Sequence, residues 1–501
     1  MSDIADKTRA EGMPPQRCSL LLRGGAVIAD PRQPAIADGA VCVDDDRIVA
    51  VGTYADLRRR YAPARELGSP QHVLLPGFIN AHDHGRAPSS LQVGIADDAL
   101  ELWIVDLLRQ PDVDPALATA YACAGQIEAG VTTVLHSFFE GAAGRYAAAV
   151  DATAAGYSAA GMRAVLALSV LDQSHIAAWL QAATPLLPAA LRQWAETFLR
   201  ARRPLPADEY FEVAPAWCAD HRGARVSAML GPVSVHWCSE TLLLRIWREA
   251  EAVAAHLQTH LLESPYQRRS ALAQYGRSAV AYLAERGLLT PRLSCAHCVQ
   301  VGENDIALLA EAGVSVVHNP GSNLRLGNGI APLPAMLRGG VNVALGLDSL
   351  ALNDDGDMLQ EMRLAACLHR PADVPDTAAV LAMATINGAR ALGIEDRVGT
   401  LAAGKKADLV LLRRAPLDAV CEASPATDAA QLVLRARRRD VDSVVIDGRV
   451  VLHQGRHLSI DKEALQREIG AVLRRSPAAE LQWRQRVKAL KPYLRKLLET
   501  P

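Results

Sequence analysis

Four apolar segments of the sequence each end in side chains that can bind a metal ion or transfer a proton. In chain order these are His82 and His84 after LLPGFINA, His260 and Glu263 in LQTHLLE, His297 in RLSCAHC, and Asp348 in VALGLDS. On a β-strand, residues i and i+2 point to the same side, so His82 and His84 can bind one ion while Asp83 points away. An HxH pair alone is a weak signal among 14 histidines. It gains weight because three further segments agree with it in order and spacing.

Strand and helix patterns alternate between about Leu74 and Leu392. Strand-like runs such as VTTVLHS and VSVVHN are separated by Ala- and Leu-rich stretches such as ALATAYACAGQIEAG. Repeated strand–helix units predict a parallel sheet. About eight units over roughly 320 residues favour a (β/α)8 TIM barrel, in which catalytic groups lie at the carboxyl ends of the strands. The segment 172–220 is too long for a plain connection and predicts a helical insertion over the site.

The two ends of the chain contain matching short strands. CSLLLRGGAVIA and GAVCVDDDRIVAVG lie near the start, and KADLVLL and VDSVVIDGRVVLHQG lie near the end. Neither segment is long enough for a stable sheet domain of its own. We therefore expect an α/β protein with one small β-sandwich domain built from residues 1–73 and 395–460, into which a barrel of residues 74–394 is inserted. Residues 461–501 are expected to form a helical tail that packs outside.

The composition of the 501-residue chain limits its partners. Lys and Arg number 53 against 55 Asp and Glu, for a formal charge of −2, so no basic excess indicates nucleic acid or an anionic membrane surface. No apolar run approaches the length needed to cross a bilayer. The polar start of the chain lacks the features of a signal peptide, so we expect a cytoplasmic location. Nine cysteines, an odd number, then favour reduced thiols over a disulfide framework.

These pieces together resemble the amidohydrolase superfamily, and within it the group of cytosine deaminases, guanine deaminases and triazine hydrolases. The resemblance covers nearly the whole chain and rests on PGFINAHDH, GVTTV, HLLE, AHC, VVHNPGSNLRLGNGIAP, VALGLDS and RVGTLAAGKKADLVLL. The metal ligands that it implies are His82, His84, His260 and Asp348. It also implies that Glu263 shuttles protons, that His297 hydrogen-bonds the attacking water or the substrate, and that Asp348 orients or deprotonates the water.

Three nitrogen ligands and one carboxylate suit Zn²⁺ or Fe²⁺, and we expect one divalent ion, with zinc favoured over iron. Binuclear members of the superfamily bridge two metals with a carbamylated lysine. The sequence has no lysine between Lys7 and Lys405, which excludes a lysine-bridged pair. Glu140, at the end of VLHSFFE, is the one carboxylate that we consider as another bridge.

The implied activity is hydrolysis at an sp² ring carbon by metal-activated water, whose pKa falls to about 7. We expect an aminohydrolase that releases ammonia from a nitrogen heterocycle such as a purine, pterin or pyrimidine. An alternative is a hydrolase that expels a thiol, an alkylamine or a halide, or that opens the ring. A third is an inactive scaffold, which the complete set of ligands and proton-transfer groups disfavours. Relatives are commonly homo-oligomers, so we expect a homodimer.

Seven further residues are candidates for contact with the substrate. Trp103 and Trp237 could stack on a flat heterocycle, although a buried tryptophan usually packs in the core. Arg86 would suit a substrate carboxylate unless it pairs with Asp97 or Asp98. The remaining candidates are Gln92, His318, Asn323 and Arg325. Arg325 could equally brace its loop, and His318 could be a polar group whose hydrogen bonds are satisfied within the protein.

Overall fold

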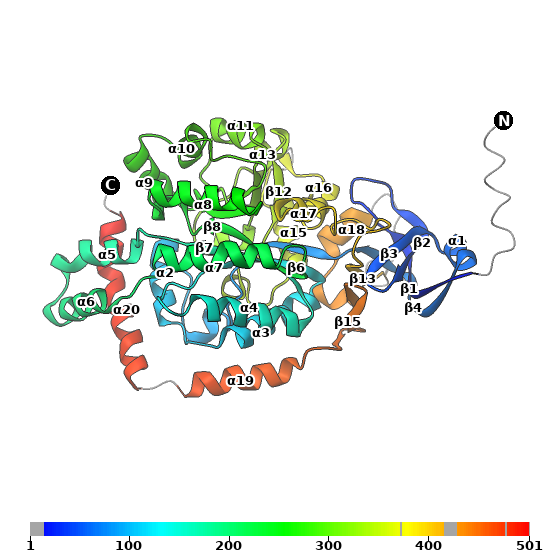
Figure 1. The fold of residues 1–501 in the computed structure, drawn as a ribbon, viewed down its shortest axis with the longest axis horizontal. Helices are drawn as coiled ribbons and strands as arrows, with labels where there is room; N and C mark the ends of the chain where they lie inside the picture. The colour runs from blue at the N-terminus through cyan, green and yellow to red at the C-terminus, as the bar shows by residue number, and fades with distance from the viewer. Residues whose placement is uncertain (1–14, 371–372, 415–427, 476–477, 500–501) are drawn as a thin grey trace.

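Two eight-stranded sheets organise the part of the chain that the computed structural model describes, which is residues 15–370, 373–414, 428–475 and 478–499. Figure 1 shows the first sheet at one end of the molecule and the second surrounded by helices. The first contains β1 (Gln16–Val27), β2 (Ile36–Asp44), β3 (Arg47–Thr53), β4 (Tyr61–Pro76), β13 (Leu409–Arg413), β14 (Val441–Ile446), β15 (Arg449–His453) and β16 (Arg456–His457). The second contains β5 (Phe78–Asp83), β6 (Val131–Phe138), β7 (Arg163–Val170), β8 (Val226–Pro232), β9 (Leu257–Leu261), β10 (Leu293–His297), β11 (Ser315–His318) and β12 (Asn342–Leu345).

The second sheet is a parallel barrel. Strands β5 to β12 pair in chain order, and the ring closes where the N–H groups of Leu347 and Asp348 donate to the carbonyl oxygen of His82 at 3.2 and 2.9 Å. Strands β6 and β7 are buried along their whole length, as expected for strands with helices outside and packed side chains inside. This confirms the predicted (β/α)8 TIM barrel.

Alternation along the barrel strands divides their side chains between two cores. Ile79, Leu135, Val165 and Val317 belong to the core inside the barrel. The helices that join the outer core are α3 (Pro115–Glu128), α4 (Tyr146–Ala160), α7 (Ala207–Asp220), α8 (Glu240–Ala252), α9 (Pro265–Tyr275), α10 (Ala279–Glu285), α11 (Glu303–Glu311), α13 (Leu333–Arg338), α15 (Met358–Cys367), α16 (Thr377–Met383) and α18 (Asp428–Arg435). Four further helices are α1 (Tyr54–Arg60), α12 (Pro320–Arg325), α14 (Leu350–Asn353) and α17 (Ile386–Ala391).

Local sequence fixes where barrel helices begin. The side chain of Asp114 accepts a hydrogen bond from the N–H of Leu117 at the start of α3, and that of Ser239 accepts one from Leu242 at the start of α8. Such N-caps satisfy backbone donors that have no partner within the helix. They fix the ends of the connections between the strands and these helices.

One small β domain is built from both ends of the chain, as predicted. Strand β13 pairs antiparallel with β4, so the two ends meet within the sheet, whose order is β16-β15-β14-β13-β4-β1-β2-β3. These eight strands are hydrogen-bonded in one continuous order. The predicted boundary after residue 73 falls inside β4, which continues to Pro76 and leads directly into β5.

A buried cluster of ion pairs joins this sheet to the barrel. Arg163, at the start of β7, donates to the carboxylate of Asp408 at 2.9 and 3.1 Å and also pairs with Asp447. Its side chain is only 2% exposed. Because a buried guanidinium is costly unless it is paired, this cluster holds the barrel in a fixed position against the sheet.

The helical insertion after β7 is shorter than predicted. Helices α5 (His175–Ala183) and α6 (Ala189–Ala201) stand apart from the barrel, but α7 packs in its outer core through Tyr210 and Trp217, as an ordinary barrel helix does. Helices α5 and α6 instead share a hydrophobic cluster with α2 (Leu100–Asp106) and the C-terminal helix α20 (Ala478–Glu499). The insertion is therefore clamped from outside by the tail of the chain.

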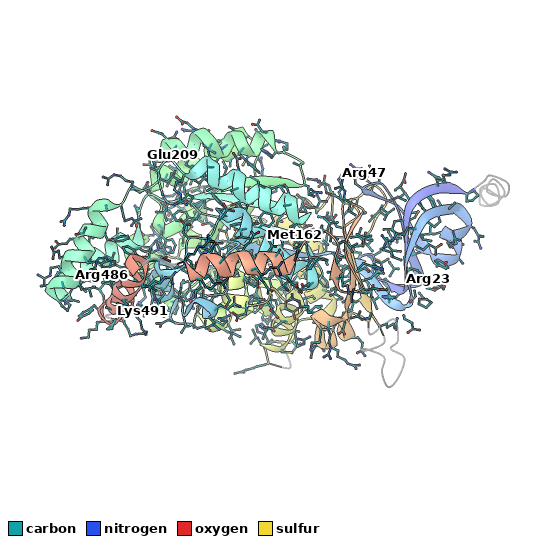
Figure 2. All side chains as sticks on the ribbon, turned by 90° about the horizontal axis from the view of Figure 1, so that it is seen from below. Arg23, Arg47, Met162, Glu209, Arg486 and Lys491 are labelled. Carbon is teal, nitrogen blue, oxygen red and sulfur yellow. The ribbon has the colours of Figure 1, made fainter. Side chains whose placement is uncertain are left out.

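The C-terminal tail is helical, as predicted. Helix α19 (Lys462–Arg474) runs along the barrel, where Lys462 pairs with Glu128 of α3. On α20, Lys491 pairs with Asp98 and Asp106 beside α2, at the end of the molecule opposite the sheet that carries Arg23 (Figure 2). In the described part of the chain, no helix has the length and apolar character required to span a membrane.

Candidate metal centre and active-site cavity

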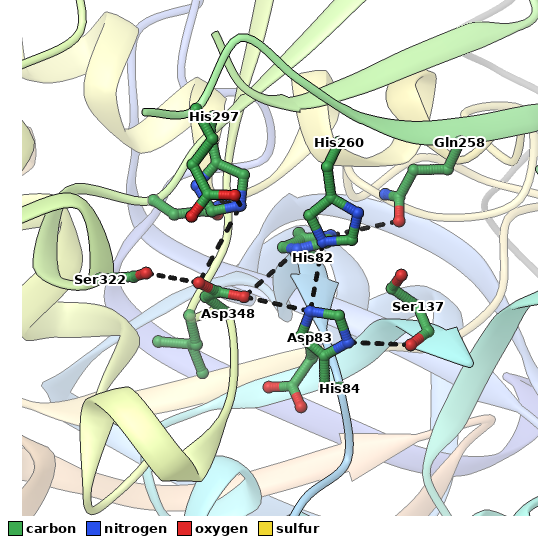
Figure 3. A network of polar contacts seen from close by, with 12 residues as sticks. His82, Asp83, His84, Ser137, Gln258, His260, His297, Ser322 and Asp348 are labelled. Carbon is green, nitrogen blue, oxygen red and sulfur yellow. Dashed lines mark hydrogen bonds and ion pairs between the residues drawn. The ribbon is translucent and has the colours of Figure 1, made fainter. Parts of the chain in front are cut away.

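Side chains with metal-binding atoms meet at the carboxyl ends of three barrel strands (Figure 3). His82 lies in β5 and His84 directly after it, His260 lies in β9, and Asp348 follows β12. The Oδ1 atom of Asp348 lies 3.3 Å from Nε2 of both His82 and His84. Nε2 of His84 lies 3.3 Å from Nε2 of His260. The structure thus brings together the four ligands that the resemblance implies.

The second nitrogen of each of these imidazoles faces a hydrogen-bond acceptor. The acceptors are the Gln258 Oε1 atom at 3.1 Å for His82, the Ser137 carbonyl at 3.0 Å for His84, and the Val233 carbonyl at 2.6 Å for His260. Each Nδ1 must therefore carry the proton, which leaves every Nε2 with a free lone pair. Among the described residues, the buried Nε2 of His82 has no hydrogen-bond donor. Converging lone pairs without donors fit a divalent cation, and acceptors behind metal-binding histidines are the usual support of such sites.

Asp348 is held as a carboxylate beside these rings. Its Oδ2 accepts a hydrogen bond from the hydroxyl of Ser322. Its backbone has a φ of 64°, a region that non-glycine residues rarely adopt and that is found at functional sites.

Asp83 lies between the two histidines of the HxH pair and points away from them, as the strand alternation predicts. Its carboxylate accepts hydrogen bonds from Asn80 at 2.8 Å, Gln126 at 3.0 Å and the N–H of Gly85 at 2.6 Å. Burial raises the pKa of Asp83 to about 6. Its contacts therefore fix the backbone of the HxH segment and keep its carboxylate away from the imidazoles of His82 and His84.

Glu263 and His297 lie beside the metal-binding atoms. Oε2 of Glu263 is 3.7 Å from Nε2 of His297, while its Oε1 accepts a hydrogen bond from Asn328 at 3.0 Å. Burial, together with the nearby Asp348 carboxylate, raises the pKa of Glu263 well above its usual range. The Nδ1 atom of His297 lies 2.9 Å from Oδ1 of Asn323, and burial lowers the pKa of His297 to about 4. Burial therefore favours the protonated form of the Glu263 carboxyl and the neutral form of the His297 imidazole.

A cavity of about 250 Å³ opens directly in front of this cluster. We call it the metal cavity. Glu263, His297 and Asp348 form its polar end, and its walls are mostly apolar, with Trp103, Trp237 and Phe139 among the aromatic residues that line it. Small-molecule sites combine apolar walls with a few placed polar groups, so the cavity suits a flat, largely apolar ring presented to the cluster.

The family to which the chain belongs follows from a comparison with models of known protein families. The model of the amidohydrolase family matches residues 73–451, and a model described as an imidazolonepropionase-like composite domain of bacteria matches residues 39–64. The chain belongs to the amidohydrolase family. This confirms the resemblance that was read from the sequence motifs.

Individual amidohydrolases of known name match over almost the whole chain. A 5-methylthioadenosine/S-adenosylhomocysteine deaminase of Desulforudis audaxviator is 34% identical over 467 residues, which are 91% of this chain and 98% of that protein. Among solved structures, an adenosine deaminase of Xanthomonas campestris with bound zinc has a TM-score of 0.78 at 32% identity and covers 95% of this chain and 100% of its own. The atrazine chlorohydrolase of Arthrobacter aurescens, complexed with zinc, has a TM-score of 0.76 at 25% identity and covers 91% and 100%.

These relatives confirm the predicted class of activity. The protein is a metal-dependent hydrolase of the amidohydrolase family that acts on carbon–nitrogen bonds in nitrogen heterocycles. The predicted divalent metal agrees with the family and with the zinc bound in the relative from X. campestris.

Three of the seven predicted substrate contacts lie in the metal cavity. Trp103, Trp237 and Arg86 line it. The alternative partners of Arg86 are engaged elsewhere, since Asp97 pairs with Arg325 and Asp98 with Lys491. The expectation that Arg86 faces the substrate therefore agrees with its position.

Four predicted contacts do not line the metal cavity. Arg325 braces its loop through Asp97 and Asp354. Asn323 holds the ring of His297, and Gln92 lies exposed on the surface, where its Oε1 accepts a hydrogen bond from Ser89. His318 follows the inward-pointing Val317, so alternation turns it toward the outer helices. The prediction that these four side chains contact the substrate directly is therefore not supported by their positions.

Glu140, the alternative metal bridge, is also placed away from the metal-binding atoms. One oxygen of its carboxylate accepts a hydrogen bond from the N–H of Ala142, and the other lies 3.5 Å from Arg145. It belongs to neither group of potential metal ligands found among the described residues. The geometry therefore offers no bridging carboxylate from this strand.

His175 is a cavity residue that the sequence analysis missed. It begins α5 and its ring stacks on Trp237, with centroids 3.6 Å apart and an angle of 18°. Both ring nitrogens are buried and make no hydrogen bond to any described residue. Burial holds the pKa of His175 well below its usual range, so the ring is neutral. Nothing in the local sequence SHIAAW reveals this contact, because its partner lies on the loop after β8.

Gln258 is a second missed residue, and here a signal was available. It lies two positions before His260 on β9, so alternation puts it on the same side of the strand. Its Nε2 donates to the carbonyl of Ala81 at 3.3 Å, which turns its Oε1 toward His82. The amide of Gln258 thus favours the tautomer of His82 in which Nδ1 carries the proton.

Proposed function

We propose that this protein is a mononuclear aminohydrolase that removes the exocyclic amino group from the adenine ring of a nucleoside as ammonia. The observation that carries the proposal is the position of Glu263, which lines the aromatic-walled cavity and lies 3.7 Å from Nε2 of His297. A proton donor at that point serves a reaction at a ring carbon beside the metal. The names of the relatives from D. audaxviator and X. campestris support adenine nucleosides as the substrate class.

The residues that would hold the metal are His82, His84, His260 and Asp348. A divalent metal bound there supplies hydroxide at neutral pH, because it lowers the pKa of its water to about 7. Trp103 and Trp237 offer apolar faces to the purine, and aromatic faces bind flat rings well. The apolar walls also exclude bulk water, which strengthens every electrostatic contact inside.

Glu263 would perform the proton transfers on the substrate. Burial raises the pKa of its carboxyl, which favours the protonated form, and the carboxyl can donate this proton to the ring nitrogen next to the attacked carbon. This makes the carbon more electrophilic. After the water adds, the same carboxylate takes up the proton of the added hydroxyl group and passes it to the amino group. The C–N bond then breaks, ammonia departs, and the oxygen stays on the ring carbon as a carbonyl. General acid–base groups of this kind accelerate reactions by about 10² to 10⁴.

His297 would accept a hydrogen bond from the attacking water. Its Nδ1 carries the proton that is shared with Asn323, so its Nε2 is an acceptor and faces Glu263 and Asp348. Because the ring is neutral, it can take up positive charge as the water loses its proton. Asp348, which remains ionised, orients the same water from the other side.

An ammonia-release assay tests this function. The zinc-loaded protein would be given adenosine, 5-methylthioadenosine and S-adenosylhomocysteine, with loss of the adenine absorbance as a second readout. Release of one ammonia per adenine chromophore lost would support the proposal. Metal-loaded protein that releases no ammonia from any of the three would contradict it.

A second candidate is hydrolytic removal of a halide or an alkylamine from the same type of ring carbon. The likeness to the atrazine chlorohydrolase favours it. The charged Arg86 in the cavity disfavours a neutral triazine, because an unpaired guanidinium gains nothing from an apolar ring. Chloride release from atrazine without ammonia release from adenosine would select this candidate.

Three finer points belong to the same proposal. We expect the ion to be zinc, the assembly to be a homodimer and the location to be cytoplasmic. The three-histidine, one-carboxylate ligand set supports zinc but suits ferrous iron as well. Elemental analysis of protein purified without added metal tests the ion, and light scattering during gel filtration tests the assembly.

A further inference from the structure

Arg86 carries a positive charge that no residue in the described part of the chain pairs. Within the described ranges, no hydrogen bond engages its guanidinium and no carboxylate lies within 4.0 Å of it. Asp83 and Asp348 are the carboxylates whose charges act on Arg86, and both are held by the partners described above. The charge is therefore not part of an internal ion pair.

Two other enclosed arginines of the chain, Arg163 and Arg325, have carboxylate partners. Arg163 is paired with two aspartates at the base of the barrel, and Arg325 pairs with two more at the loop behind the cavity. Arg86 instead lies in a cavity whose walls include Leu107, Leu108 and Phe139. Since an enclosed charge without a partner is costly, its position calls for a partner that arrives from outside.

Arg86 also stands where two cavities meet. A second cavity of about 220 Å³, which we call the side cavity, shares His84, Arg86, Ser137 and Phe139 with the metal cavity. Among the described residues that line either cavity, Arg86 is the only lysine or arginine. A ligand whose ring occupies the metal cavity could thus place a substituent beside the guanidinium, toward the side cavity.

The backbone fixes Arg86 at this point. Gly85, between His84 and Arg86, has a φ of 57°, and a Cβ there would lie 2.4 Å from the ring of His136. Any other residue would be strained and would collide with that ring. The turn therefore ties the position of Arg86 to that of a metal-binding histidine, which makes the arginine a fixed reference point relative to the reacting carbon.

We propose that Arg86 is a specificity-determining residue that binds a carboxylate carried by the heterocyclic substrate. The planar guanidinium matches a carboxylate with two parallel hydrogen bonds. A single cation suits a singly charged group better than a phosphate, which carries nearly two charges. The inference rests on the proposed function, because it assumes that the heterocycle occupies the metal cavity.

The principal test compares two nucleosides that share the adenine ring and differ in charge. S-adenosylhomocysteine carries a carboxylate and 5-methylthioadenosine carries none. Replacement of Arg86 by Gln should lower kcat/KM for S-adenosylhomocysteine by about 10- to 100-fold, the range for a lost charged hydrogen bond, and should change that for 5-methylthioadenosine by less than about threefold. R86K should recover part of the loss. R145Q is the matched control, since Arg145 is 56% exposed and lines neither cavity.

Equal losses on both nucleosides in R86Q would overturn the inference and assign Arg86 to the common ring or to the fold. A second arm separates this from failure of the proposed function. Calorimetry would measure binding of nicotinate and nicotinamide, which share a flat ring and differ in the carboxylate. Tighter binding of nicotinate that R86Q abolishes would support the inference even if neither nucleoside is deaminated. Equal affinities in the wild type, or no saturable binding of nicotinate, would overturn it.

Discussion

The Nε2 atoms of His84 and His260 lie 3.3 Å apart, although the Nδ1 atom of each ring faces a backbone carbonyl. Each ring therefore points a lone pair at the other, and no hydrogen bond can join them. Such an arrangement is unfavourable by itself and becomes favourable when a cation lies between the nitrogens. The fold holds these rings in place for an ion through contacts that the sequence positions on separate strands.

Replacement of Glu263 by Gln should leave the metal bound and remove most of the turnover. The amide cannot carry a proton between water and substrate, so kcat should fall by about 10² to 10⁴. Stopped assays of ammonia release and elemental analysis on the same sample measure both quantities. Turnover close to that of the wild type would remove Glu263 from the mechanism.

Replacement of His175 by Ala should raise KM with a smaller effect on kcat. The ring is one wall of the metal cavity, and its buried nitrogens have no hydrogen-bond partner among the residues that the structure describes. We therefore expect it to hydrogen-bond the substrate, with KM rising about tenfold when the ring is lost. His221→Ala is a matched control, because His221 stacks on Trp217 at 3.7 Å outside the metal cavity. An equal change in both variants would assign the effect to the loss of a stacked ring.

Replacement of Arg163 by Met should destabilise the whole fold. The change leaves Asp408 and Asp447 without their shared cation at the base of the barrel, and breaking a buried pair in this way costs about 3–5 kcal/mol. Denaturant unfolding measures the difference, with exposed Arg145→Gln as the control expected to change little. A loss below about 1 kcal/mol would show that the cluster does not join the two sheets energetically.

The buried carboxyl of Glu361 should make stability depend on pH. Burial raises its pKa to about 8, against about 4.3 in an unfolded chain. Between these values the folded state holds a proton that the unfolded state has lost, so this contribution to stability is complete below the lower pKa and is lost as the pH rises through 8. The unfolding free energy of the wild type should fall relative to Glu361→Gln by about 1.4 kcal/mol per pH unit in this window. Parallel pH profiles of the two proteins would contradict this.

Local patterns in the sequence predicted the barrel and the residues that end its strands. His82, His84, His260 and Asp348 could be found because each follows a short apolar run, and parallel strands deliver their ends to one edge. The predicted direction of Asp83 followed from alternation alone. The same reasoning applied at β11 would have turned His318 away from the site, since its neighbour Val317 points inward.

Contacts between distant loops could not be predicted in this way. Arg325 is engaged by Asp97, which lies 228 positions earlier in the chain, and no local pattern reveals that pairing. The stack of His175 on Trp237 joins the insertion to a different loop. The extent of the insertion was overestimated for a related reason: α7 has the composition of the helices around it, and only its packing identifies it as a barrel helix.

The most direct test of the account is ammonia release from adenosine and its 5′-substituted thioethers by one preparation, measured before metal removal, after chelation and after zinc is returned. The account predicts one ammonia per adenine, activity that chelation abolishes, and recovery at one zinc per chain. Deamination that survives complete removal of the metal, or zinc-loaded protein that deaminates none of these nucleosides, would contradict it.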